Sequence, residues 1–193
     1  IYMGDRTMKK LFLTAILSGS VLRLAAAPVV IDDFEKGKSD GWTVYKDAKS
    51  PAAQLAVTDD AISGDGALKV MLGGCTRYQG IQFFKVPVMP EKAVAVSFLV
   101  KPVSGPPPTA LALSERKERY GRDLATAVAN LKISGDDWQK ITVPLASMKY
   151  GSGPERGKAF PFKPGAVYSL RFYGAVSERP SVFLLDDIVW ETE

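Results

Sequence analysis

Short apolar runs rich in β-branched and aromatic residues recur along the chain, separated by Gly, Pro, Asp and Ser. Between residues 28 and 193 there are about eleven runs of strand length, and none shows the 3.6-residue period of an amphipathic helix. The predicted strands are 29–34, 42–46, 54–59, 67–72, 78–86, 93–102, 109–115, 125–133, 138–145, 167–175 and 182–190. This pattern predicts an all-β fold, an antiparallel β-sandwich or jelly roll.

Alternation assigns faces to these strands, because successive side chains of a strand point to opposite sides. In the run 167–175 one side carries the larger apolar residues and is the natural core side: Tyr168, Leu170 and Phe172. The opposite side carries groups suited to hydrogen bonding and stacking: Ser169, Arg171 and Tyr173.

The run 78–86 has aromatic residues on both sides, so its orientation stays open. If Ile81 and Phe83 face the core, Tyr78 and Gln82 lie on the same outer face as the polar side of 167–175. The candidate ligand-binding residues are then Tyr78, Gln82, Arg171 and Tyr173. The alternative is an ordinary solvated sheet face.

Two acidic clusters interrupt the first and last apolar runs. Asp32, Asp33 and Glu35 follow Ile31, and the pair at 186 and 187 divides the run 182–190. If the first and last strands are neighbours, these carboxylates converge, and buried like charges need compensation. A calcium ion accepts such hard oxygen ligands. Alternatively, some of the acids face solvent while others cap turns or form ion pairs.

The N-terminal region has the pattern of a secretory signal. A basic start at 8–10 precedes an apolar run at 11–22 and small residues at 25–27. We therefore predict an upstream extension over 1–7, a signal peptide over 8–27 and a single domain over 28–193. The apolar run is too short for a membrane span, which takes about 20 residues. The expected location is secreted or periplasmic, with no transmembrane segment after cleavage.

Charge and residue usage exclude several function classes. The chain has a net charge of +4, and residues 1–27 supply four basic residues against one acidic residue, so the rest is near +1. This balance gives no support for nucleic-acid binding. Cys75 is the sole cysteine, so no intrachain disulfide can form, and there is no histidine. Triads with an imidazole base are thereby excluded.

Several short segments together resemble a known family. They are "DDFE" at 32–35 with "GW" at 41–42, "SGDGALKV" at 63–70, "VSFLVKP" at 96–102, "DDWQKITVPLASM" at 136–148 and "LLDDIVW" at 184–190. In this order they resemble β-sandwich carbohydrate-binding modules of galactose-binding-like fold, family eleven in particular. The resemblance implies a structural calcium between the first and last strands. Matched residue by residue, it implies Glu35 and Asp186 as the calcium ligands, with Asp186 turned inward and Asp187 facing the other way.

The expected function is a non-catalytic, exported carbohydrate-binding domain that acts as a monomer on a polysaccharide or oligosaccharide. Two alternatives stay open at this point. One is a polysaccharide lyase or hydrolase of jelly-roll fold, so an enzyme is not excluded. The other is an assembly or interaction protein similar to the complex I intermediate-associated family, although the signal peptide argues against a mitochondrial role.

Overall fold

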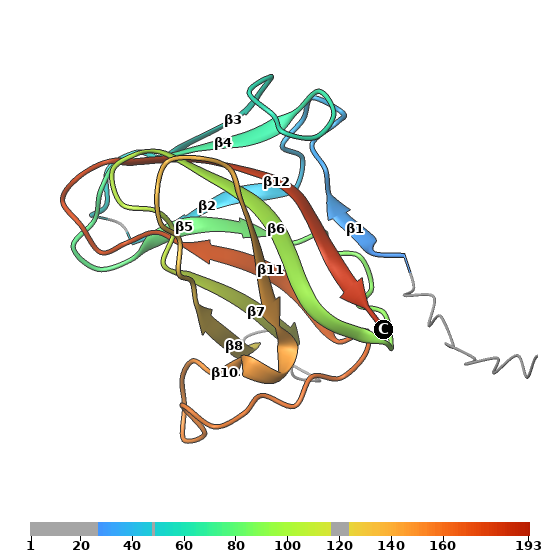
Figure 1. Ribbon diagram of the computed structural model, residues 1–193. Helices are drawn as coiled ribbons and strands as arrows, with labels where there is room; N and C mark the ends of the chain where they lie inside the picture. Colours follow the sequence, from blue (N-terminus) through green and yellow to red (C-terminus); the bar gives the residue numbers. More distant parts are fainter. Residues whose placement is uncertain (1–26, 48, 117–123) are drawn as a thin grey trace, which may run out of the picture.

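The computed structural model describes residues 27–47, 49–116 and 124–193, which form two antiparallel sheets packed face to face (Figure 1). These residues contain twelve strands, one turn of 3₁₀-helix, η1 (Leu145–Ser147), and no α-helix. The prediction of an all-β antiparallel sandwich is therefore confirmed. The described residues include no helix that is long and apolar enough to cross a membrane.

Sheet A is organised around the long last strand, β12 (Ser181–Thr192), which pairs along its length with β6 (Ala93–Ser104). On its other side, the first half of β12 pairs with β4 (Ala67–Leu72) and the second half with β1 (Val29–Asp32). Its path runs β3–β4–β12–β6–β9, and β1 also pairs with β12. The bounds are β1 (Val29–Asp32), β3 (Gln54–Thr58), β4 (Ala67–Leu72), β6 (Ala93–Ser104), β9 (Gln139–Pro144) and β12 (Ser181–Thr192). Since Val29 pairs with Trp190, the first and last strands are neighbours, as the acidic clusters required.

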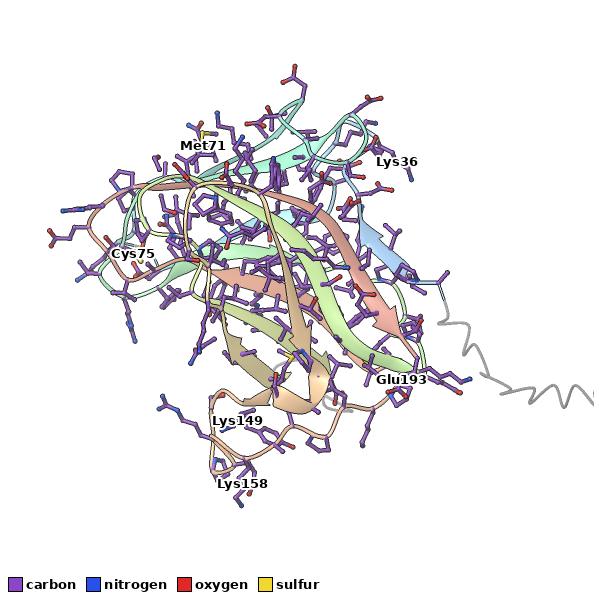
Figure 2. All side chains as sticks on the ribbon, in the orientation of Figure 1. Lys36, Met71, Cys75, Lys149, Lys158 and Glu193 are labelled. Atoms are coloured by element: carbon purple, nitrogen blue, oxygen red, sulfur yellow. The ribbon has the colours of Figure 1, made fainter. Side chains whose placement is uncertain are left out.

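Sheet B follows the order β10–β8–β7–β11–β5–β2. Its bounds are β2 (Trp42–Lys46), β5 (Gln79–Phe83), β7 (Ala110–Arg116), β8 (Leu124–Asn130), β10 (Lys149–Tyr150) and β11 (Val167–Tyr173). The helical turn η1 connects β9 of sheet A to β10 of sheet B. Side chains fill the space between the two sheets, as Figure 2 shows.

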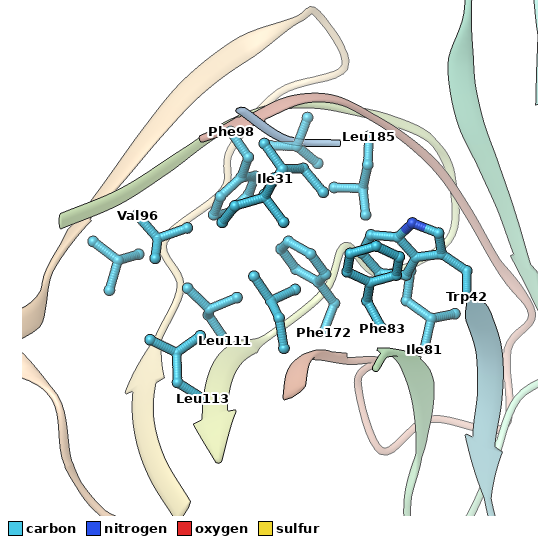
Figure 3. Close-up of a cluster of buried hydrophobic side chains, with 14 of the residues drawn as sticks. Ile31, Trp42, Ile81, Phe83, Val96, Phe98, Leu111, Leu113, Phe172 and Leu185 are labelled. Atoms are coloured by element: carbon cyan, nitrogen blue, oxygen red, sulfur yellow. The ribbon is translucent and has the colours of Figure 1, made fainter. Parts of the chain in front are cut away.

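The core is built from the inward side chains of both sheets (Figure 3). Trp42 stacks on Phe83 with ring centroids 4.9 Å apart, and Phe98 of sheet A meets Phe172 of sheet B edge to face at 4.8 Å. Trp190 is fully buried. Burying an apolar side chain of this size contributes about 1.5–3 kcal/mol, so these rings fix the two sheets against each other.

The sequence assigned Tyr168 of β11 to the wrong face of the sheet. In the pairing of β11 with β7, Val167 lies opposite Glu115 and Ser169 opposite Ser114, so Tyr168 occupies a bulge. Val167 takes the core position, whereas Tyr168 is half-buried, outside the core. Beyond the bulge the predicted alternation holds.

The expected extension (1–7) and signal peptide (8–27) lie outside the described residues, apart from Ala27. These boundaries, and the single domain over 28–193, stay predictions.

Candidate functional site

Three neighbouring strands of sheet B bring the predicted ligand-binding residues onto one outer face. Ile81 and Phe83 are buried in the core, which settles the orientation of β5 that the sequence left open. Across the sheet, Gln82 pairs with Thr43 of β2 and Arg171 of β11. In the next row on the same face, Gly80 pairs with Tyr45 and Tyr173.

Gly80 lets the two tyrosines on either side of it meet. The Tyr45 and Tyr173 rings are edge to face, with centroids 5.8 Å apart, although a strand lies between them. A Cβ on Gly80 would lie only 2.1 Å from the carbonyl oxygen of Phe172. The close approach of β5 and β11 therefore requires glycine at this position.

Tyr45 is the centre of a larger aromatic cluster. It stacks on Tyr78, with centroids 5.2 Å apart, and the guanidinium carbon of Arg171 lies 4.7 Å from its ring centroid. Burial raises the pKa of the Tyr45 phenol, and the neighbouring Tyr173 raises it further. We name Tyr45, Tyr78, Tyr173 and Arg171 the tyrosine cluster.

Sequence reasoning found three members of this cluster but missed Tyr45. Its position was readable, since Trp42 and Val44 alternate with Thr43 and Tyr45 in the run 42–46. With Trp42 in the core, Tyr45 has to lie on the outer face.

The face also carries buried polar atoms without a partner. Within the described residues, Gln82 Nε2, Ser169 Oγ and Arg171 Nε have no hydrogen-bond partner. The Gln82 side chain is on the predicted face, but it is only 3% exposed and so is not presented at the surface. Leaving a buried donor or acceptor unpaired costs about 1–3 kcal/mol, which a bound ligand or water can recover.

A cavity of about 460 Å³ lies beside the tyrosine cluster and is lined by Asp47, Lys49, Thr76 and Arg77. The guanidinium carbon of Arg77 is 5.9 Å from the Tyr78 ring centroid. Asp47 uses its Oδ1 to accept the backbone N–H groups of Lys49 and Ser50, at 2.8 and 2.9 Å.

The first acidic cluster shapes a turn. Asp32 Oδ2 accepts a hydrogen bond from Trp42 Nε1 at 2.8 Å, and its Oδ1 accepts the N–H of Phe34 at 3.1 Å. Burial raises the pKa of this carboxyl. Asp33 accepts the N–H of Glu35 at 3.3 Å. These bonds hold Phe34 at a φ of 58° with its ring buried against Trp42.

The two predicted calcium ligands both hold the loop before β4. Glu35 accepts the N–H of Asp65 at 2.8 Å, and Gly64 packs so closely on this carboxylate that any side chain there would collide with it. Asp186 is fully buried and accepts the N–H groups of Ser63 and Asp187 at 3.3 and 2.7 Å.

Burial raises the pKa of Asp186 to about 6. Asp187 is half-buried with a φ of 44°, at the bulge where the register of β12 against β6 shifts. Asp186 is buried, as expected for this pair, but it lies outside the core cluster, on the same side of sheet A as its partner Leu99, and the loop before β4 covers it.

These two carboxylates offer a cation part of a hard-oxygen ligand set. The described residues contain no group of three or more His, Cys, Asp or Glu that could hold a metal. Carbonyl oxygens of the loop would have to complete the set, and the ion would compete with N–H donors for Glu35 and Asp186. The calcium site therefore stays a prediction, and its role would be to hold this loop in place.

Cys75 is buried, and Trp42 and Trp190 are in the core. Trp138 is half-buried just before β9, outside the core cluster.

No protein-family model matches the sequence, and no curated protein matches it. Solved structures do match its fold. The family 11 carbohydrate-binding module of a cellulosomal cellulase from Clostridium thermocellum has a TM-score of 0.69 at 18% identity, covering 88% of this chain and 96% of that chain. The family 11 module from the same organism in complex with a β-1,3-1,4-mixed-linked tetrasaccharide gives 0.70 at 18% identity, covering 87% and 98%.

A xylan-binding domain from Paenibacillus barcinonensis has a TM-score of 0.53 at 21% identity, covering 86% of this chain and 97% of that domain. At these identities the likeness concerns the fold. The chain has a β-sandwich fold like that of the family 11 carbohydrate-binding modules.

Proposed function

We propose that the outer face of sheet B binds a polysaccharide or oligosaccharide, and that the chain is a non-catalytic carbohydrate-binding domain. The observation that carries the proposal is the tyrosine cluster, in which rings from β2, β11 and the residue before β5 meet around Gly80. Sugar recognition needs flat apolar surfaces for the faces of the pyranose rings and polar groups for the hydroxyls. Both are present on this face.

The unpaired polar atoms support the same proposal. Gln82 Nε2 and Ser169 Oγ lie beneath or beside the tyrosine cluster without partners among the described residues. A sugar hydroxyl both donates and accepts hydrogen bonds, so it can satisfy either atom, directly or through water, once the side chains that cover the atom shift aside. The fold adds a further argument, because a family 11 module of similar structure was solved with a bound tetrasaccharide.

A non-catalytic role agrees with the arrangement of the acids at the β1–β12 corner. Asp32, Asp33, Glu35 and Asp186 each accept backbone N–H groups of nearby turns or loops. Export and a structural calcium ion belong to the proposal as well. They rest on the signal pattern at 8–27 and on the resemblance at Glu35 and Asp186.

The test is affinity gel electrophoresis of the chain against soluble polysaccharides, followed by calorimetry on those that retard it. Tyr45→Ala and Tyr173→Ala should each weaken binding about tenfold or more, because each removes a stacking ring. Trp138→Ala is the matched control, since it removes a half-buried aromatic outside sheet B. Equal binding by all three variants, or no retardation of the parent by any polysaccharide, would refute the proposal.

A further inference from the structure

The outer face of sheet B has a one-sided charge distribution. The strand register places Lys149, Val128, Ala112, Arg171, Gln82 and Thr43 in one row across all six strands. Arg171 lies near the middle of this row and Lys149, labelled in Figure 2, at its β10 end. Both described charges in the row are therefore positive.

Among the residues that the structure describes, no acidic side chain of the sheet B strands balances them on this face. Among the described residues, the strands of sheet B contain one acid, Glu115. It alternates with Ser114 and so points to the opposite side of β7, where it accepts the N–H of Lys163 at 2.9 Å. Asp47, directly after β2, is engaged by the amides of its own turn and lies beside Lys49.

Arg171 is half-buried and has no counter-charge among the residues that the structure describes. In the described part of the chain it forms no ion pair, and its Nε has no hydrogen-bond partner. Its guanidinium lies over the face of the Tyr45 ring. A partly desolvated guanidinium with free N–H groups is the protein group best matched to a carboxylate, which it can bind through two parallel hydrogen bonds.

A second cation lies at the other end of the aromatic stack. Arg171 covers Tyr45, Tyr45 stacks on Tyr78, and Arg77 lies over Tyr78. Two guanidinium groups thus flank a pair of stacked rings. A polymer with a carboxylate on successive sugars can present one charge to each arginine while its rings lie along the tyrosines.

We propose that this face selects acidic polysaccharides, in which uronic acid residues supply the carboxylates. The inference rests on the proposed carbohydrate-binding function and narrows its ligand class. Arg171 and Arg77 would bind carboxylates. Tyr45 and Tyr78 would contact the sugar rings through their ring edges, since their faces are covered by each other and by the two guanidinium groups. Lys149 adds long-range attraction along the same face.

The test compares polymers that differ only in their carboxylates. Polygalacturonate and alginate are each paired with their carboxyl-reduced form, and neutral mixed-linkage β-glucan is added, in buffer without calcium. We expect the chain to bind at least one acid polymer about tenfold or more tightly than its reduced form. Because the contacts are ionic, raising the salt concentration should reduce this difference.

Variants of the two arginines then test whether the preference for acidic polymers arises from the outer face of sheet B. Arg171→Gln should remove it, and Arg77→Gln, at an exposed position, should weaken it without disturbing the fold. Lys69→Gln is the matched control, because it removes one positive charge from β4 in sheet A.

The outcomes separate the two proposals. Equal binding to an acid polymer and its reduced form, or a preference that survives in both arginine variants, overturns the inference and leaves carbohydrate binding standing. Equally tight binding to dextran sulfate overturns the carboxylate assignment. Failure to bind any acidic or neutral polysaccharide overturns the proposed function itself.

Discussion

The hydrogen bond between Trp42 and Asp32 gives the sharpest test of how the first acidic cluster works. The indole N–H donates to Asp32 Oδ2 at 2.8 Å from a side chain that is only 6% exposed. In Trp42→Phe this bond is lost, and a bond to a charged acceptor contributes about 1.5–3 kcal/mol. The smaller ring also leaves a gap beside Phe83, which adds about 1 kcal/mol. We expect a total destabilisation of about 3 kcal/mol.

Asp32→Asn should destabilise the fold much less than Trp42→Phe, because the pKa of Asp32 is raised in the folded state. Because burial holds the folded-state pKa of Asp32 above its ordinary 3.8, ionisation weakens the fold as the pH rises through that interval. Asparagine removes this unfavourable ionisation and keeps one acceptor oxygen for Trp42, although its amide nitrogen cannot accept the hydrogen bond from the Phe34 N–H. The variant should therefore lose less than half of what Trp42→Phe loses at pH 7.

Urea unfolding followed by far-UV circular dichroism measures both variants without relying on tryptophan emission. Trp138→Phe is the control, because Trp138 is half-buried outside the core and should cost well under half as much. If Asp32→Asn is as damaging as Trp42→Phe, the charge itself stabilises the turn and the argument from burial is wrong. If Trp42→Phe costs less than about 1 kcal/mol, the hydrogen bond has little net effect.

Three further predictions concern the acidic corner, the strand that carries Gly80 and the carboxylate of Glu191 in β12. Calcium should raise the melting temperature and a chelator should lower it, and Glu35→Gln or Asp186→Asn should remove the difference. A melting temperature that does not change with chelator would mean that both carboxylates only anchor the loop. Gly80→Ala should destabilise the fold by about 1–3 kcal/mol and weaken sugar binding, because its Cβ would collide with the Phe172 carbonyl oxygen; wild-type stability and affinity would contradict the close packing. Hydrogen bonds from Ser97 and Lys140 lower the pKa of Glu191. Its ionised carboxylate therefore stabilises the fold above pH 4.5, and this stabilisation is lost as the pH falls through the folded-state pKa. In thermal melts at decreasing pH, the difference in stability between wild type and Glu191→Gln should close over that range.

The two faces of sheet B could be predicted because alternation is a local property. Once Leu170 and Phe172 are in the core, Arg171 and Tyr173 have to lie outside, and the register confirms this. The same rule failed at Tyr168, because a bulge adds one residue to β11 and no residue type in the run marks it. An error of this kind changes the face of a residue without changing the strand assignment.

The partners of the acids could not be predicted, because they depend on contacts between distant segments. Glu35 binds an N–H group 30 residues away, and Asp186 binds one 123 residues away. The sequence identifies carboxylates whose negative charge needs a partner, but backbone N–H groups, metal ions and basic side chains can all be that partner. Only the arrangement of the loop before β4 distinguishes among them.

The outer face can keep unpaired polar atoms because the inner face of the same strands is so well packed. Ile81, Leu170 and Phe172 are fully buried, and each contributes about 1.5–3 kcal/mol. These contributions are comparable to the roughly 1–3 kcal/mol lost at each unpaired atom of Gln82, Ser169 and Arg171. The backbone that carries the tyrosine cluster is therefore held by the core before a ligand arrives. A ligand that lies on the tyrosine cluster does not have to order these strands, which favours binding by a preformed surface.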